Sequence, residues 1–184
     1  MKFEIHTLQS APEGSRPVLA EVERAYGFIP NLLGVLAESP LAVAAYPQLN
    51  QLLQSKSSLT PQEQQVALLT VSHENGCEYC MGAHCSLAAM AQTPPGIIQS
   101  LRDGIPPLDA RAAALVKFTR TLVKQRGWVD DSVVAEFLAA GFNRAQVLDV
   151  LVILALKTLS NYTNHLAGTP LDEAFASQKW TRAT

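Results

Sequence analysis

Few of the residues in this chain of 184 are charged, and no charge of one sign dominates. Lys and Arg number 14 against 16 Asp and Glu, which leaves a formal net charge of −2. No basic stripe is present that could follow a phosphate backbone. We therefore expect no nucleic-acid partner.

Long hydrophobic runs are also missing. The most apolar stretch, residues 150–156, lies between Asp149 and Lys157 and is far shorter than the about 20 residues that cross a bilayer. The N-terminal residues lack the apolar stretch of roughly 7–15 residues that a signal peptide needs. The expectation is a cytoplasmic protein without a membrane partner.

Strand and hairpin signals are absent, whereas the 11 prolines stand where helices would begin. Hydrophobic residues make up 48% of the chain, enough for a core in a single domain. We predict an all-α, multi-helix bundle of roughly eight to ten helices with short connections. It forms one domain over residues 1–184, with residues 1–14 at the periphery.

Helix start and stop signals give the expected boundaries. Thr60 to Glu63 form a capping box around an N1 proline and predict a helix over residues 60–75. Asn75-Gly76 predicts its end, and the next helix should run from Cys77 to about Ala91. Further helices are expected after Ser39-Pro40, Thr93-Pro94, Asp109 and either Asp130 or Asp131, and from the Asn143/Gln146 capping box to Gly168. Pro47 should kink or divide the first of these.

The last of these predicted helices is apolar nearly all round. Its middle, residues 150–156, is rich in β-branched residues, but its length and both end signals favour a helix over a strand. We expect it to lie centrally or in a subunit contact.

Only three cysteines occur, Cys77, Cys80 and Cys85, and they are clustered. A secreted disulfide framework would be spread along the chain, so the cluster predicts a local redox or metal site. Cys77, Cys80 and His84 follow the pattern CxxCxxxH, which on a helix places the three side chains within a sector of roughly 60°.

This spacing favours redox chemistry. A helix N-terminus stabilises a thiolate, and His84 is placed to accept the proton of Cys80 directly or through a water. Cys80 is then the nucleophile and Cys77 its resolving partner, although Cys77 lies closer to the helix start and the opposite assignment stays open.

Zinc binding is the main alternative, but Cys77, Cys80 and His84 supply only three of the four ligands that a structural zinc prefers. We therefore expect no metal. Cys85 is interpreted as a small core residue, and Tyr79 as part of the wall of the site or a hydrogen-bond donor to it.

The run LTPQEQQVALLTVSHENGCEYCMGAH resembles the core motif of the alkylhydroperoxidase D-like (AhpD-like) proteins of the carboxymuconolactone decarboxylase superfamily. The resemblance extends upstream through GFIPNLLGVLAESP and downstream to NYTNHLAGTPLDEAF, with the core motif over about residues 59–91. It is nearest to the peroxidase-related branch that has one such motif. The resemblance implies an AhpD-like all-α fold and a homo-oligomer, often a trimer or hexamer. It also implies antioxidant reduction of hydroperoxides by the paired cysteines.

One position departs from the family pattern. Peroxidase members usually carry a Glu in a proton relay with the His, twelve residues before the first Cys, where this chain has Gln65. An amide does not take up a proton at neutral pH. Glu63 is interpreted as a helix cap, while Glu74 and His73 are the candidates for compensation.

The leading prediction is a thiol-dependent peroxidase or disulfide oxidoreductase that takes electrons from a small thiol or protein reductant and binds no cofactor. A decarboxylase-like lyase is the alternative from another enzyme class, although decarboxylation needs no cysteine pair. A non-catalytic, oligomeric redox sensor is the third reading, motivated by Gln65.

Overall fold

Helices account for nearly all the regular structure in residues 2–182, the part of the chain that the computed structural model describes. No strand occurs in that range, and the predicted all-α class is confirmed. The α-helices are α1 (Arg16–Tyr26), α2 (Asn31–Leu36), α3 (Pro40–Lys56), α4 (Pro61–Glu74), α5 (Glu78–Met90), α6 (Pro95–Arg102), α7 (Ala110–Lys124), α8 (Asp131–Ala139) and α9 (Arg144–Ala167). Two 3₁₀ helices, η1 (Glu13–Ser15) and η2 (Glu173–Gln178), lie near the ends of the chain.

The predicted caps account for where the helices begin. At α4, Thr60 Oγ1 accepts a hydrogen bond from Glu63 N at 3.2 Å, and Glu63 Oε2 accepts one from Thr60 N at 2.8 Å. The same reciprocal pair, Asn143 and Gln146, begins α9. Gly76 has φ +67°, a left-handed conformation that ends α4 and lets α5 begin two residues later.

Pro47 does not divide α3, which runs unbroken from Pro40 to Lys56. Of the two outcomes expected for Pro47, a kink or a division, the division is therefore wrong. Val43 and Leu53, on either side of the proline, are both buried, and α3 lies along α9. Packing along this length offsets the loss of one backbone hydrogen bond at the proline.

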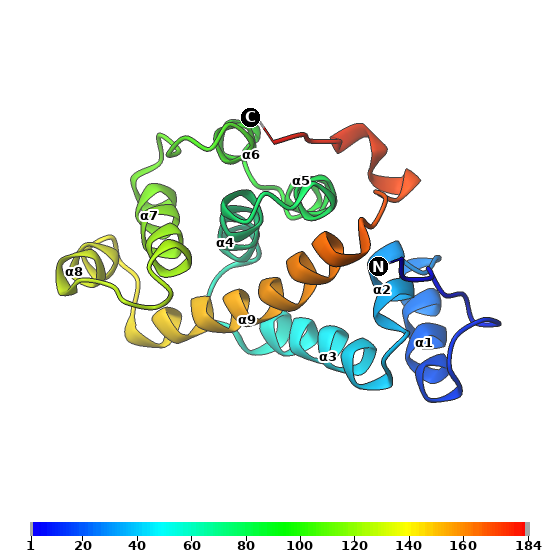
Figure 1. Cartoon of the computed structure of the whole chain (residues 1–184). Coiled ribbons are helices and arrows are strands. Elements are labelled where there is room, and N and C mark those ends of the chain that lie inside the picture. Colours follow the sequence, from blue (N-terminus) through cyan, green and yellow to red (C-terminus); the bar gives the residue numbers. More distant parts are fainter. Residues whose placement is uncertain (1, 183–184) are drawn as a thin grey trace.

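Helix α9 crosses the molecule and contacts α2, α3, α4 and α5 (Figure 1). Helices α7 and α8 lie at one end of it and α1 and α2 at the other. By length and composition α9 is apolar enough to cross a membrane. Because one side of it is buried by these neighbours, we interpret it as the core helix of the fold, as its apolar sequence predicts.

Two clusters of buried residues make up the interior. The larger is formed by α4, α7, α8 and α9 together with one side of α5, including Met81 and Cys85. The smaller lies under α1, α2 and α3 and includes the other side of α5, with Cys77 and Cys80. Helix α5 therefore separates the two clusters and turns its cysteine pair toward the N-terminal helices.

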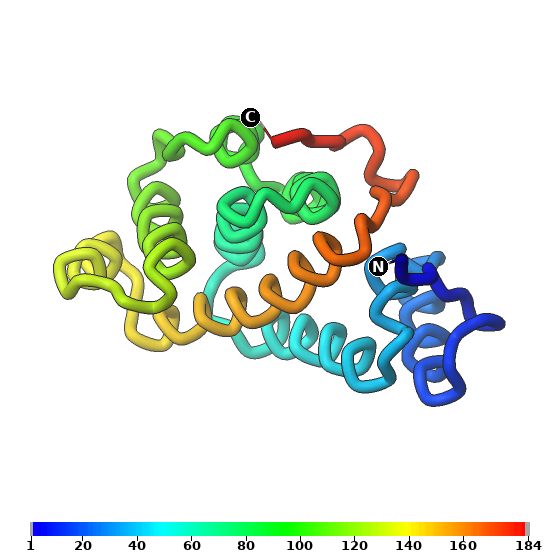
Figure 2. The backbone as a smooth tube through the Cα atoms, viewed as in Figure 1, coloured from blue at the N-terminus to red at the C-terminus, as the bar shows by residue number. Residues whose placement is uncertain are grey.

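The chain after α9 forms a C-terminal strap, residues 168–182, which returns over α5 to reach α6 (Figure 2). A Cβ at Gly82 would stand 2.9 Å from both methyl groups of Leu171, so a glycine is needed where the strap meets α5. Trp180 Nε1 donates to Arg102 O at 2.9 Å and fastens the far end of the strap.

Candidate active site: a buried thiol pair

The two cysteines of the CxxC motif lie at the start of α5, where Cys77 is the N-cap residue and Cys80 is in the first turn. Both are free thiols, with only 1% and 2% of their surface exposed. The first-turn backbone N–H groups and the positive end of the helix dipole favour negative charge at this place.

One amide brings the two sulfurs together. Asn164 Nδ2 donates to Cys80 Sγ at 3.3 Å and lies 3.7 Å from Cys77 Sγ. Asn164 belongs to α9, so the thiol pair faces the core helix. Ser160, one turn earlier on α9, has its Oγ 4.0 Å from Cys80 Sγ.

The side of α9 that faces the cysteines is polar. Lys157, Ser160, Asn161 and Asn164 recur at helical spacing, and all are buried. Along the same side, Val150, Ile153 and Leu156 precede them and form core. None of the four polar residues was predicted as a site residue from the sequence. Polar residues at core positions of an apolar helix were the signal available.

The two thiols have opposite acidities. Burial alone would raise the pKa of Cys80, but the hydrogen bond from the Cys77 thiol, the positive charge of Lys157 and the Asn164 amide hold it well below its usual value. The hydrogen bond to Cys80, together with burial, raises the pKa of Cys77. The arrangement therefore holds Cys80 as thiolate and Cys77 as thiol.

Tyr46, from α3, completes the surroundings of the pair. Burial, followed by the negative charge of Cys80, raises the pKa of its hydroxyl, while a hydrogen bond with Ser160 opposes the rise. The hydroxyl is thus a neutral neighbour of the thiolate. The sequence placed residue 46 in a helix but carried no signal for this contact.

His84 is buried on α5, and its Nδ1 donates to Gln65 Oε1 of α4 at 3.0 Å. The pairing of these two positions follows the family pattern, with an amide in place of the carboxylate. Burial, and then the charge of Lys157, lower the pKa of His84 well below its usual value, so the imidazole is neutral at pH 7.

Among residues 2–182, the only hydrogen bond of His84 is the one to Gln65, and neither sulfur is bonded to its ring. The structure therefore has no hydrogen bond through which Cys80 could pass its proton directly to His84. The charge next to the thiolate comes from Lys157 instead.

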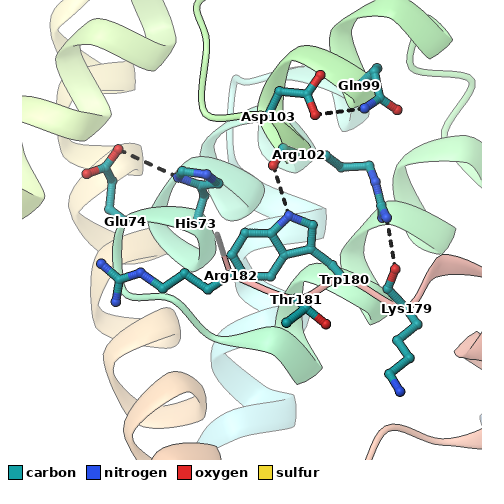
Figure 3. A pocket seen from close by; sticks show the side chains of 9 residues that line it. All are labelled: His73, Glu74, Gln99, Arg102, Asp103, Lys179, Trp180, Thr181 and Arg182. Carbon is teal, nitrogen blue, oxygen red and sulfur yellow. Dashed lines mark hydrogen bonds and ion pairs between the residues drawn. The ribbon is translucent and has the colours of Figure 1, made fainter. Parts of the chain in front are cut away.

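Glu74 and His73, the candidates for replacing a relay carboxylate, lie elsewhere. Glu74 pairs with Arg120, and with Lys124 at 3.3 Å. His73 packs on Trp180 with ring centroids 5.4 Å apart. Both His73 and Glu74 line a depression of about 660 Å³ beneath the strap (Figure 3). They lie about two helical turns or more beyond Gln65 on α4, so neither stands in for it next to His84.

Tyr79 supports the site from outside. Its hydroxyl donates to Asp172 Oδ2 at 2.5 Å and accepts from Leu32 N at 3.3 Å. Burial and the Asp172 carboxylate raise its pKa. These hydrogen bonds agree with the expected role of Tyr79 as part of the wall of the site, because they connect α5 to α2 and to the strap. The hydroxyl has no further hydrogen to donate to the sulfurs.

Cys85 lies on the opposite side of α5, 1% exposed, with Arg102 Nη1 at 3.4 Å from its Sγ. It belongs to the larger core cluster, as its interpretation as a core residue predicts. Within the described residues, no group of three or more His, Cys, Asp and Glu side chains is placed to hold a metal ion.

Comparisons with known proteins agree with this architecture. Residues 40–103 match the model of the carboxymuconolactone decarboxylase family, a segment that contains α3 to α6 with both cysteines of the pair, Gln65 and His84. Comparison with curated protein sequences gives no match.

Solved structures share the fold over nearly the whole chain. One is a peroxidase-related protein with an alkylhydroperoxidase AhpD core from Ralstonia eutropha JMP134, with TM-score 0.81 and 23% identity over 95% of this chain and 93% of the other. A peroxidase-related protein from Silicibacter sp. TM1040 has TM-score 0.79 and 19% identity, over 92% of this chain and 90% of its own. A variant of the debrominase Bmp8 in complex with 2,3,4-tribromopyrrole has TM-score 0.78 and 14% identity, over 97% of this chain and 95% of the other.

The fold is therefore that of the AhpD-like proteins, with a buried thiol pair at the start of its fifth helix. Residues 40–103 match the carboxymuconolactone decarboxylase family model, and the likeness to the solved structures shows the fold.

Proposed function

We propose that this protein is a thiol-dependent peroxidase that reduces hydroperoxides through Cys80 and Cys77. The observation that carries the proposal is the pair of sulfurs joined by the Asn164 amide, with the pKa of Cys80 lowered and that of Cys77 raised. A peroxidase of this kind needs one thiolate to attack and one thiol to resolve, and these are the two states that the site favours.

In the first step, the Cys80 thiolate attacks the terminal oxygen of a hydroperoxide. An S–O bond forms as the O–O bond breaks, the sulfur loses two electrons, and the departing alkoxide takes up a proton to leave as the alcohol. Cys80 becomes a sulfenic acid.

In the second step, the Cys77 sulfur attacks the sulfenic sulfur. The S–S bond forms, and the sulfenic hydroxyl leaves with the Cys77 proton as water. Two equivalents of a small thiol, or one dithiol protein, then return both cysteines to the reduced state and are themselves oxidised to a disulfide. The cycle needs no bound cofactor.

His84 and Gln65 have a supporting role in this proposal. With Nδ1–H bonded to Gln65, the free Nε2 of the neutral ring is an acceptor and can orient the hydroperoxide or a water. Burial of both sulfurs favours compact hydroperoxides over bulky ones.

The other reactions considered have less support. A decarboxylase-like lyase gives no reason for a thiol pair of opposite acidities. A redox sensor would use the same thiolate and resolving thiol, so peroxide turnover is what separates it from a peroxidase. The debrominase Bmp8 has the same fold, so the fold alone does not define the reaction; the thiol pair carries the proposal.

We also propose that the protein is a homo-oligomer, a trimer or hexamer as the family resemblance implies. The outer side of α9 exposes Leu148, Leu151, Tyr162 and Leu166. An apolar stripe of this length is typical of a surface that a second copy covers.

The central test is peroxide turnover by single-cysteine variants in the presence of a thiol reductant. Cys80→Ser should abolish the reaction with peroxide. Cys77→Ser should react once and stop at a sulfenic acid, which a sulfenic-acid probe detects by mass on the peptide that contains Cys80. Cys85→Ser is the matched control and should retain turnover.

Turnover that survives in both Cys77→Ser and Cys80→Ser would exclude the mechanism. A wild-type protein that forms the Cys77–Cys80 disulfide but turns over no peroxide would instead favour the redox sensor.

A further inference from the structure

Lys157 is the most unusual residue of the interior. Its side chain is fully buried, with 0% of its surface exposed, in the middle of an apolar helix. Its Nζ makes no hydrogen bond of ordinary geometry to any residue within 2–182. Burying an ammonium group without a partner is costly, so a lysine at this position needs an anion nearby.

The position of Lys157 on α9 identifies that anion. Lys157 lies two helical turns before Asn164, which donates to Cys80 Sγ at 3.3 Å, and one turn before Ser160, whose Oγ is 4.0 Å from the same sulfur. These side chains share one side of the helix. The charge of Lys157 also acts on both Cys80 and His84.

The other charged or titratable groups around Cys80 cannot serve as its cation. On α5, Cys77 is held as a neutral thiol and His84 as a neutral imidazole. Tyr46 of α3 and Tyr79 of α5 are neutral phenols. Helix α4 contributes the uncharged amide of Gln65 next to His84.

We propose that Lys157 is the fixed counter-cation of the Cys80 thiolate and that the ammonium–thiolate pair replaces the carboxylate–histidine relay of the family pattern. Lys157 is thus a positioning residue for charge. Burial and the charge of Lys157 keep the neighbouring His84 neutral, so that no second positive charge competes.

This inference rests on the proposed function only for the purpose of the ion pair, because the pairing itself does not require peroxide as the substrate. It is therefore tested without peroxide. In a Cys77→Ser/Cys85→Ser background Cys80 is the only thiol, and the serine hydroxyl preserves a donor at position 77. The thiolate is followed from pH 4 to 10 by its ultraviolet absorbance and by the rate of alkylation with iodoacetamide.

We expect the background protein to titrate well below the usual cysteine value of about 8.5. Lys157→Met, which keeps the length and removes the charge, should move the midpoint up by at least about one pH unit and lower alkylation at pH 7 about tenfold. Lys157→Arg keeps the charge and should stay near the background. Lys124→Met, on the surface of α7, is the matched control and should change nothing.

Circular dichroism first establishes that each variant is folded, and Lys157→Gln provides a second neutral replacement if Lys157→Met is not. An unchanged thiolate midpoint in a folded neutral variant would overturn the proposal, even if the protein is a peroxidase. A shifted midpoint in a protein without peroxidase activity would support the ion pair and reject only the reaction.

Discussion

At the scale of single residues, the site differs from the family pattern in its charges: the relay carboxylate is absent, and a buried lysine is present on another helix. Gln65 occupies the position of the relay carboxylate, and its oxygen accepts from His84 Nδ1 at 3.0 Å. A neutral amide does not favour an imidazolium, whereas a carboxylate would. The positive charge of the site therefore resides on Lys157, on a different helix.

The variant Gln65→Glu tests this exchange. A carboxylate in hydrogen-bond contact should raise the pKa of His84 from well below 6.5 to above it, because an opposite charge favours the protonated ring. We expect no gain in the peroxide rate constant beyond about threefold, roughly 0.7 kcal/mol, because the thiolate already has its cation. NMR titration of the His84 ring and stopped-flow peroxide kinetics measure the two effects.

Gln65→Met is the control for this variant, because it removes the amide without adding a charge and should leave His84 neutral. A large rise in rate in Gln65→Glu would mean that the native relay is impaired and that Lys157 does not replace it.

At the scale of elements, the site depends on how α5 is held between α9 and the C-terminal strap. The Tyr79 hydroxyl connects three elements, because it donates to Asp172 of the strap and accepts from Leu32 N in α2. Asp172 also accepts from Asn31 N at 2.9 Å and so serves the N-terminus of α2. One phenol thus fixes the segments around the thiol pair without contacting the sulfurs.

Tyr79→Phe should lower the free energy of unfolding by about 1–3 kcal/mol, because it leaves Oδ2 of the buried Asp172 and the backbone N–H of Leu32 without a partner. Urea denaturation followed by circular dichroism measures this loss. The rate of alkylation of Cys80 in the folded protein should stay close to that of the wild type.

Tyr26→Phe is the matched control, since that side chain is 54% exposed, and it should change stability little. A change in the thiolate midpoint of Tyr79→Phe, rather than in stability, would mean that Tyr79 donates to the site after all.

At the scale of the whole molecule, α9 has two different sides. Its inner side supplies core residues and then the polar side chains of the site, while its outer side exposes an apolar stripe. A surface of this kind is expected to be covered in an assembly. The homo-oligomer and the site would then be built on the same helix.

Light scattering coupled to size-exclusion chromatography should give a mass three or six times the 19.9 kDa of one chain. Leu148→Glu/Leu166→Glu should shift this mass to that of the monomer, because burying two carboxylates in an apolar contact is costly. Leu108→Glu, at a fully exposed position between α6 and α7, is the control and should leave the assembly intact. A monomeric wild type at micromolar concentration would contradict the proposal.

Much of this protein follows from local sequence signals. The Thr60 and Asn143 capping boxes, Gly76 and the CxxC spacing act over a few residues, so they determine where helices begin and end and place two thiols in one turn. The family resemblance carried the pairing of Gln65 with His84, which the contact at 3.0 Å agrees with.

Contacts between distant segments were decided only by the tertiary structure. Asn164 lies 87 positions from Cys77, and nothing in the local pattern around either residue states that they meet. Lys157 reads in sequence as the polar flank of an apolar run, and only the packing of α9 against α5 buries its charge beside a sulfur. Helix ends are set by nearest neighbours in the chain, but the acidity of a thiol depends on every charge within a few ångströms, whatever its place in the sequence.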